Sequence, residues 1–120
     1  MSAVLSLRAL TAAVTDGAGE RILLDQVALD LAGGQRTAVT GRSGSGKSTL
    51  LSIAGLLRSP GSGDVLLDGE GTAELSERRR ARLRGERIGI VYQNANLIPN
   101  LTAIEQLELV GHVLGARRNL

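Results

Sequence analysis

Residues 41–48 of this 120-residue chain read Gly41-Arg42-Ser43-Gly44-Ser45-Gly46-Lys47-Ser48, and Thr49 follows. The order glycine, four residues, then Gly-Lys-Ser is the phosphate-binding P-loop pattern. Lys47 is the single lysine among the fourteen lysine and arginine residues of the chain. A compact, flexible ammonium suits phosphate, whereas the chain uses arginine at every other basic position. The stretch therefore predicts binding of a nucleoside triphosphate.

The composition of the loop follows from what a triphosphate needs, which is many N–H donors aimed at one point. Successive amides converge only where the chain wraps tightly, and glycine permits this because it tolerates positive φ. A helix should begin near Gly46 or Lys47, so that its free amides and positive dipole end face the phosphates. Lys47 would reach the β- and γ-phosphates, and the Ser48 hydroxyl would ligate Mg²⁺. The expected phosphate-binding residues are Gly41, Arg42, Ser43, Gly44, Ser45, Gly46, Lys47, Ser48 and Thr49.

The alternative interpretation is an ordinary loop rich in glycine and serine. At average composition, an accidental match in a chain of this length has a probability well under about 1%. The flanking segments also fit a P-loop. Residues 36–40 are rich in β-branched side chains and predict the strand that leads in. Residues 47–57 carry a broad apolar set that stops before Pro60-Gly61, which predicts the helix that leads out.

The remaining segments predict strands first and then alternating helices and strands. Thr102-Ala103-Ile104-Glu105 fits a capping box and should start the last helix, which runs to about Gly115. The expected elements are an edge strand at 3–10, a turn at 16–19, strand at 22–31, a short strand at 65–67, a helix at 76–84, a strand at 87–92 and a loop at 93–100. This order predicts an α/β fold, with a partial parallel sheet of the P-loop type and antiparallel strands at the N-terminus.

The amino-acid composition argues against several classes of protein function. The chain has no cysteine, so it holds neither a disulfide framework nor a cysteine metal site. No apolar stretch reaches eighteen residues and no signal peptide is recognised, so we expect a cytoplasmic location. A net charge of +2 and a single aromatic residue, Tyr92, argue against a nucleic-acid partner. At this length we expect one domain at most.

Residues 91–105, from Val91-Tyr92-Gln93 to Ile104-Glu105, resemble the Q-loop of ABC transporter ATPase domains. Residues 63–69, Gly-Asp-Val-Leu-Leu-Asp-Gly, resemble the strand and turn that follow the P-loop helix in that family. The resemblance covers the chain from about Leu5 to Gly115. Asn96-Leu97-Ile98-Pro99 followed by Leu101-Thr102-Ala103 is closest to the subgroup that serves lipoprotein release and macrolide-type export.

The resemblance implies a role for Gln93 and a set of partners. In the family, the glutamine at this position contacts Mg²⁺ or the attacking water and senses the γ-phosphate. ATP binds between two such nucleotide-binding subunits, and hydrolysis drives an integral membrane permease at the cytoplasmic face of the membrane. The loop after the glutamine lies near the permease, and here it includes Leu97, Ile98, Leu101 and Ile104. Taken alone, Gln93 fits an ordinary loop amide better, with these aliphatic residues as core. The P-loop at the family spacing reverses that preference.

The chain also departs from the family pattern. By alignment, Val14 stands where the family has an aromatic residue that stacks on adenine, so stacking should be weaker. The signature Leu-Ser-Gly-Gly-Gln, the strand ending in Asp-Glu and the switch histidine do not occur in these 120 residues. We therefore expect a single ATP-binding domain that is incomplete at the C-terminus, with P-loop 41–49 and Q-loop at about 92–100, and nearly inactive alone. Asp68 and His112 could replace the missing groups, but they fit a turn and a helix surface better.

An arginine run lies at positions 78, 79, 80, 82, 84 and 87. Interleaved Glu77 and Glu86 favour a solvated helix face, which is the usual meaning of such a run. A sharper interpretation is a phosphate-clamping lid, as in small nucleotide kinases. A small P-loop phosphotransferase with an arginine-rich lid, or a non-hydrolytic nucleotide-binding module, is therefore the alternative to an ABC-type ATP-binding subunit.

Overall fold

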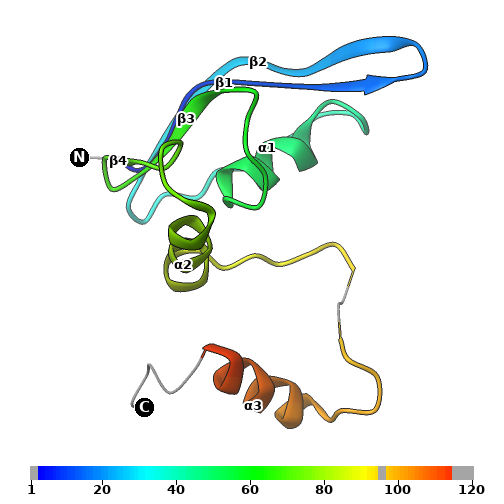
Figure 1. Ribbon diagram of the computed structural model, residues 1–120, viewed down its shortest axis with the longest axis vertical. Helices are drawn as coiled ribbons and strands as arrows, with labels where there is room; N and C mark the ends of the chain where they lie inside the picture. Colours follow the sequence, from blue (N-terminus) through cyan, green and yellow to red (C-terminus); the bar gives the residue numbers. More distant parts are fainter. Residues whose placement is uncertain (1–2, 95–96, 115–120) are drawn as a thin grey trace. The chain divides into compact units, whose positions relative to one another are not determined.

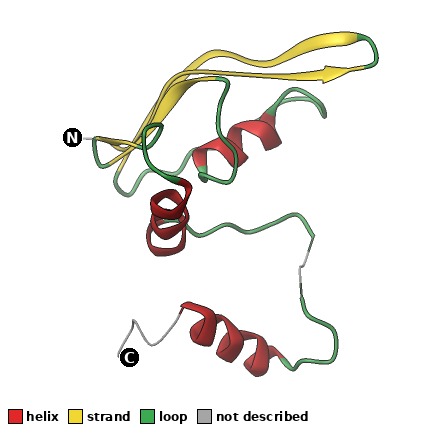
Figure 2. Cartoon of the chain, viewed as in Figure 1, coloured by secondary structure: helices red, strands yellow, loops and turns green. Residues whose placement is uncertain are grey.

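The computed structural model describes residues 3–94 and 97–114. By its internal contacts the chain forms two compact units, Met1–Ile88 and Gly89–Leu120. The first unit holds a β-sheet and two helices, and the second holds one helix (Figures 1 and 2).

The sheet of the first unit has four antiparallel strands in the order β2-β1-β3-β4. Their bounds are β1 Ala3–Asp16, β2 Gly19–Ala32, β3 Ser62–Leu67 and β4 Glu70–Gly71. The prediction that residues 3–10 form an edge strand is wrong, because β1 pairs with β2 on one side and β3 on the other. The predicted turn at 16–19 is confirmed: Asp16 pairs with Gly19, and the Asp16 carboxylate accepts a hydrogen bond from the Ala18 N–H at 2.8 Å.

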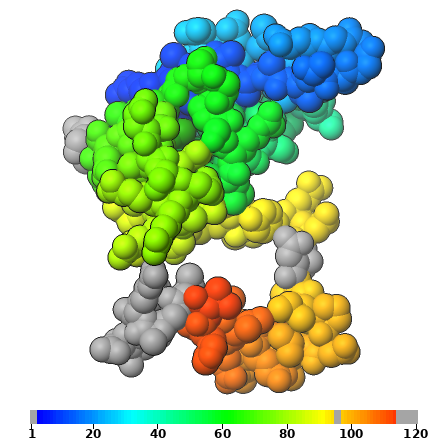
Figure 3. Space-filling view, in the orientation of Figure 1, coloured from blue at the N-terminus to red at the C-terminus, as the bar shows by residue number. Residues whose placement is uncertain are grey.

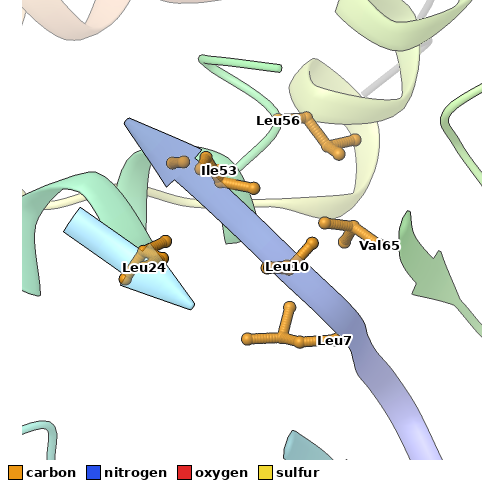
Figure 4. Close-up of a cluster of buried hydrophobic side chains, with 7 residues drawn as sticks. Leu7, Leu10, Leu24, Ile53, Leu56 and Val65 are labelled. Atoms are coloured by element: carbon orange, nitrogen blue, oxygen red, sulfur yellow. The ribbon is translucent and has the colours of Figure 1, made fainter. Parts of the chain in front are cut away.

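The core lies between the sheet and α1, which spans Lys47–Ala54. Leu7 and Leu10 of β1 are buried, and Ile53 of α1 and Leu56 after it face them (Figure 4). The helix ends three residues before the predicted Leu57, because Gly55 caps it and Leu56 has a φ of 61°. That bend turns the Leu56 side chain into the core. The complete set of buried apolar residues is Leu7, Leu10, Ala12, Leu24, Ile53, Leu56 and Val65.

Two predicted strands do not form. Residues 36–40 and 88–92 have no strand assignment, and Arg87 is the last residue of a helix, α2 Glu77–Arg87. A parallel strand of an α/β sheet is buried on both faces and needs neighbours for its backbone groups. Here Val39 is 37% exposed and Val91 99% exposed, and neither segment pairs with the four-stranded sheet of the described residues. The α/β class is confirmed, but every strand pair that the structure describes is antiparallel.

Side-chain hydrogen bonds fix the connections around β3 and α2. The Asp64 carboxylate of β3 accepts N–H bonds from Val65, Thr72 and Ala73, which ties the end of the β3–β4 hairpin to β3. Ser76 caps α2, because its hydroxyl accepts from the Arg79 N–H at 3.3 Å. The predicted helix at 76–84 is therefore present and extends three residues further, to Arg87.

The second unit contains α3, Ala103–Leu114, and its predicted capping box is confirmed. The Thr102 N–H donates to the Glu105 carboxylate at 2.9 Å, and the Thr102 hydroxyl accepts from the Glu105 N–H at 3.1 Å. Within the described residues, we find no helix with the length and apolar character needed to cross a membrane.

The capping box gives the first testable prediction. The Thr102 backbone N–H, and then the Thr102 side chain, hold the pKa of Glu105 below its usual value. Because the folded pKa is lowered, the cap stabilises α3 above the unfolded pKa of about 4.3, and this support is lost as pH falls through the folded pKa. In an NMR titration we expect the Glu105 carboxyl to titrate below a glutamate in an unstructured peptide. Thr102→Ala should move the midpoint part of the way back up, because it removes the side-chain contribution and keeps the backbone N–H; an unchanged midpoint would contradict this explanation.

Candidate phosphate-binding site

The loop at 41–46 leads into α1 through Gly46, which is the N-cap residue (Figure 1). Gly46 has a φ of 98°, and its carbonyl accepts the Leu50 N–H at 2.9 Å. In any α-helix the first amides have no acceptor one turn earlier. A glycine cap also has no side chain to bond them, so the helix start presents unsatisfied N–H donors together with the positive end of its dipole.

The loop before the helix is wrapped tightly. Gly44 has a φ of 82°, and the Ser45 N–H donates to the Arg42 carbonyl at 3.1 Å. A Cβ built on Gly41 would lie 2.7 Å from the Ser45 hydroxyl oxygen, so the two ends of the turn nearly touch. A chain curled in this way can aim several backbone amides into one concave space, which is the shape that binds anions.

Lys47 folds back across this loop. Its ammonium donates to the Gly41 carbonyl and, at 3.0 Å, to the Arg42 carbonyl. The residue is half-buried, and both ammonium hydrogen bonds end on carbonyls of the loop itself. Ser48 follows in the first helical turn with an exposed side chain, and Thr49 after it is half-buried. Residues 41–49 therefore form a curled loop that continues into the first turn of α1.

The loop is seated on β2. A Cβ on Gly46 would lie 2.6 Å from the Leu23 carbonyl oxygen and 3.3 Å from a methyl group of Leu24. The β1–β2 register shifts here, because Ala12 pairs with Leu24 but Ala13 pairs with Ile22. Leu23 is therefore the extra residue of a β-bulge, a feature that re-aims the local backbone. No sequence signal predicted this contact between Gly46 and the bulge at Leu23, because a bulge depends on the pairing of two strands.

The other predicted site residues lie apart from the loop along the chain. Val14 is half-buried on β1 and pairs with Arg21 of β2, within the first unit. Gln93 belongs to the second unit and is exposed at a bend. Asp68 forms the β3–β4 turn and pairs with the Arg87 guanidinium, and His112 is exposed on α3.

The arginine run anchors α2 to its own unit. Arg84 donates to the Leu56 carbonyl at 2.6 Å, and Arg80 donates to the Ser59 hydroxyl at 2.6 Å. The Arg80 Nε is buried without a hydrogen-bond partner in the described residues, so this anchoring leaves one donor unsatisfied. Four arginines of the run are exposed, namely Arg78, Arg79, Arg82 and Arg87, of which Arg87 still pairs with Asp68. Part of the arginine run is thus a solvated helix face, as the sequence analysis favoured, and part of it makes structural contacts. None of these contacts favours a phosphate-clamping lid.

Comparison with known proteins places this fold and loop in one family. The ABC transporter family matches residues 24–119. The lipoprotein-releasing system ATP-binding protein LolD of Shewanella denitrificans is 40% identical over 115 residues, which are 96% of this chain and 49% of that protein. LolD of Nitrobacter hamburgensis is 46% identical over 105 residues, 88% of this chain and 45% of that protein.

Solved structures support the same family assignment. The dimeric structure of MJ0796, a bacterial ABC transporter cassette, superposes with a TM-score of 0.85 at 35% identity, and covers 97% of this chain and 50% of that one. A post-hydrolysis state of MJ0796 bound to ADP and Pi gives the same TM-score, identity and coverage. The fold and loop are those of a P-loop ATPase cassette. This chain belongs to the ABC transporter family, and it spans about half the length of the curated relatives it matches.

The seat of the loop gives the second testable prediction. Gly46→Ala should lower the free energy of unfolding by about 2–5 kcal/mol, because a left-handed residue with a side chain is strained and its Cβ meets the Leu23 carbonyl. Gly44→Ala, which is left-handed but has open space, should cost about 1–2 kcal/mol. The matched control is Gly17→Ala, where a Cβ meets nothing within 4 Å. Denaturant unfolding measures the free energy of unfolding of all three variants. Equal losses for Gly44→Ala and Gly46→Ala would contradict a role for the close approach of Gly46 to the Leu23 carbonyl.

Proposed function

We propose that this chain is the P-loop and Q-loop half of the ATP-binding subunit of an ABC transporter. The observation that carries the proposal is the start of α1, where unsatisfied amides, a tight loop and the Lys47 ammonium converge. Residues 41–49 would bind the phosphates of ATP. The family match over residues 24–119 and the LolD relatives support ATP as the nucleotide and transport as the process.

The phosphate tail would be held by the chain's own groups. The amides at the start of α1 would donate to the phosphate oxygens, favoured by the helix dipole. The Lys47 ammonium now bonds two neutral carbonyls of its own loop. A phosphate oxygen carries charge and is the stronger acceptor, so Lys47 would turn to the β- and γ-phosphates while staying within the same curl.

Mg²⁺ fits this site as a partner of the nucleotide. The exposed Ser48 side chain offers a hard oxygen ligand beside Lys47, and Mg²⁺ is commonly bound by few protein groups together with substrate phosphates. When bound, the ion would neutralise charge on the phosphates. Gln93 is exposed in the second unit, and its amide oxygen is of the type that binds Mg²⁺ or orients an attacking water, the role that the family resemblance implies for it.

The partners would be a second nucleotide-binding subunit and an integral membrane permease, which would hold the chain at the cytoplasmic face of the membrane. Exposed aliphatic residues in the second unit support a protein partner there: Leu97 is 69% exposed, Ile98 46% and Ile104 67%. Apolar side chains grouped on a surface are typical of interaction sites. The LolD relatives favour a lipoprotein-release system as the transporter.

The third testable prediction concerns the ammonium. Lys47→Met keeps most of the apolar stem and removes the charge, so Mg-ATP affinity should fall roughly 10–100-fold, the range expected for charge-assisted hydrogen bonds. The matched control is Arg58→Met, which removes one positive charge from an exposed position beyond α1 and should leave the affinity unchanged. Isothermal titration calorimetry measures both. Equal affinities for Lys47→Met and the wild type would contradict the proposal.

The fourth testable prediction concerns turnover. The 120 residues contain neither a Leu-Ser-Gly-Gly-Gln signature nor a strand ending in Asp-Glu. Positioning by the P-loop would then lack the donors and the carboxylate that stabilise the transferring phosphoryl group. We expect phosphate release from Mg-ATP by the 120-residue chain to stay at background in a malachite-green assay. Turnover near the enzyme median of about 10 s⁻¹ would refute this expectation.

A further inference from the structure

A pocket of about 200 Å³ lies within the first unit, where the end of α1, the start of β3 and α2 meet. Figure 3 shows α2, in yellow-green, beside the green residues that follow α1 on the surface of this unit. The apolar lining includes Ile53, Leu56 and Val65, which Figure 4 labels, and the polar lining includes Ser59, Asp64 and Arg80. No residue of the phosphate-binding segment 41–49 lines the pocket, so it is a separate site.

Arg80 brings an unused hydrogen-bond donor to this pocket. Its Nη1 donates to the Ser59 hydroxyl at 2.6 Å, whereas its Nε is buried and has no acceptor among the described residues. A buried donor without an acceptor has lost its hydration and gained nothing in exchange, so such groups are rare in folded proteins. The N–H groups along the Nε edge of a guanidinium form a planar fork that matches a carboxylate. Arg80 is therefore arranged to receive an oxygen acceptor.

Asp64 brings an unused acceptor to the same pocket. Its Oδ1 accepts the N–H groups of Val65, Thr72 and Ala73 at 2.8, 3.1 and 2.9 Å, and its Oδ2 accepts no hydrogen bond from the described residues. Arg80 and Asp64 form no ion pair with each other, so the guanidinium nitrogens and the carboxylate oxygens are more than 4.0 Å apart. Two opposite charges thus line one pocket without direct contact.

These charges determine which ligand fits. A simple anion would bind Arg80 but be repelled by the Asp64 carboxylate, and a simple cation would meet the opposite problem. A zwitterion offers each side chain its complement, and an aliphatic group on it would lie against the apolar lining. The pocket is several times larger than the volume of about 30 Å³ that one water molecule occupies. The pocket therefore has room for a small organic molecule.

We propose that this pocket binds a small aliphatic α-amino acid. The ligand carboxylate accepts hydrogen bonds from the Arg80 guanidinium, and the ligand ammonium donates to the Asp64 carboxylate. The aliphatic side chain lies against Ile53, Leu56 and Val65. This inference goes beyond the proposed function and does not depend on it, because no nucleotide-binding residue takes part.

The test compares ligands of one shape that differ in charge. L-valine carries both charged groups, isovalerate lacks the ammonium, and isobutylammonium lacks the carboxylate. Each ligand, and inorganic phosphate as a fourth, is titrated at neutral pH into the ¹⁵N-labelled 120-residue chain. L-valine should give saturable shifts at the amides of residues 61–64 and 72–73. It should bind roughly 10-fold or more tightly than each of the other three, because each of those lacks one charge-assisted hydrogen bond.

Two variants and a matched control assign the contacts. Arg80→Met removes the guanidinium, and Asp64→Asn removes the negative charge while keeping an oxygen for the three N–H bonds. Each should weaken L-valine binding roughly 10–100-fold. The control Arg78→Met removes a positive charge from an exposed position on the same helix and should leave the affinity unchanged.

Three outcomes would overturn the proposal. A wild type without saturable shifts from L-valine would mean that the pocket holds only water. Isovalerate or phosphate binding as tightly as L-valine would mean a simple anion site in which Asp64 plays no part. Unchanged L-valine affinity in Arg80→Met would mean that Arg80 does not hold the ligand. Circular dichroism checks the fold of each variant, and the comparison of ligands on the wild type decides the proposal even where a variant does not fold.

Discussion

The close approach of the Gly46 backbone to the Leu23 carbonyl is the constraint on which the site depends. A side chain at Gly46 would collide with β2, and the left-handed φ of this residue is easy for glycine and strained for others. The approach sets where α1 begins and which amides stay without partners. α1 then packs Ile53 under the sheet. The same helix therefore carries the phosphate-binding loop at its start and a core residue near its end.

The arginine side chains of α2 and the single lysine have different roles. The arginines Arg80, Arg84 and Arg87 reach groups of their own unit, and their planar, multiply donating heads hold α2 against the chain after α1 and the β3–β4 turn. The single ammonium, Lys47, is placed where the loop curls and bonds only backbone carbonyls. A point charge on a flexible stem can exchange such partners for a ligand with little rearrangement.

Local signals were enough to predict the loop, the start of α1, the turn at 16–19 and the capping box of α3, because each depends on residues a few positions apart. The segments 36–40 and 88–92 look like strands, but a strand exists only beside a partner, and sequence periodicity does not name one. The bulge at Leu23 and the anchoring of Arg84 on Leu56 likewise depend on distant pairings. The central place of β1 could not be predicted for the same reason.

Backbone amide resonances of the ¹⁵N-labelled protein during titration with Mg-ATP test most directly whether the start of α1 binds phosphate. Saturable shifts should be largest at the start of α1, from Gly46 to Thr49, and tripolyphosphate should reproduce them there while adenosine should not. Unmoved resonances in this segment, with ATP binding observed elsewhere on the protein, would contradict the central claim that phosphate binds at the start of α1, where Gly46 contacts β2.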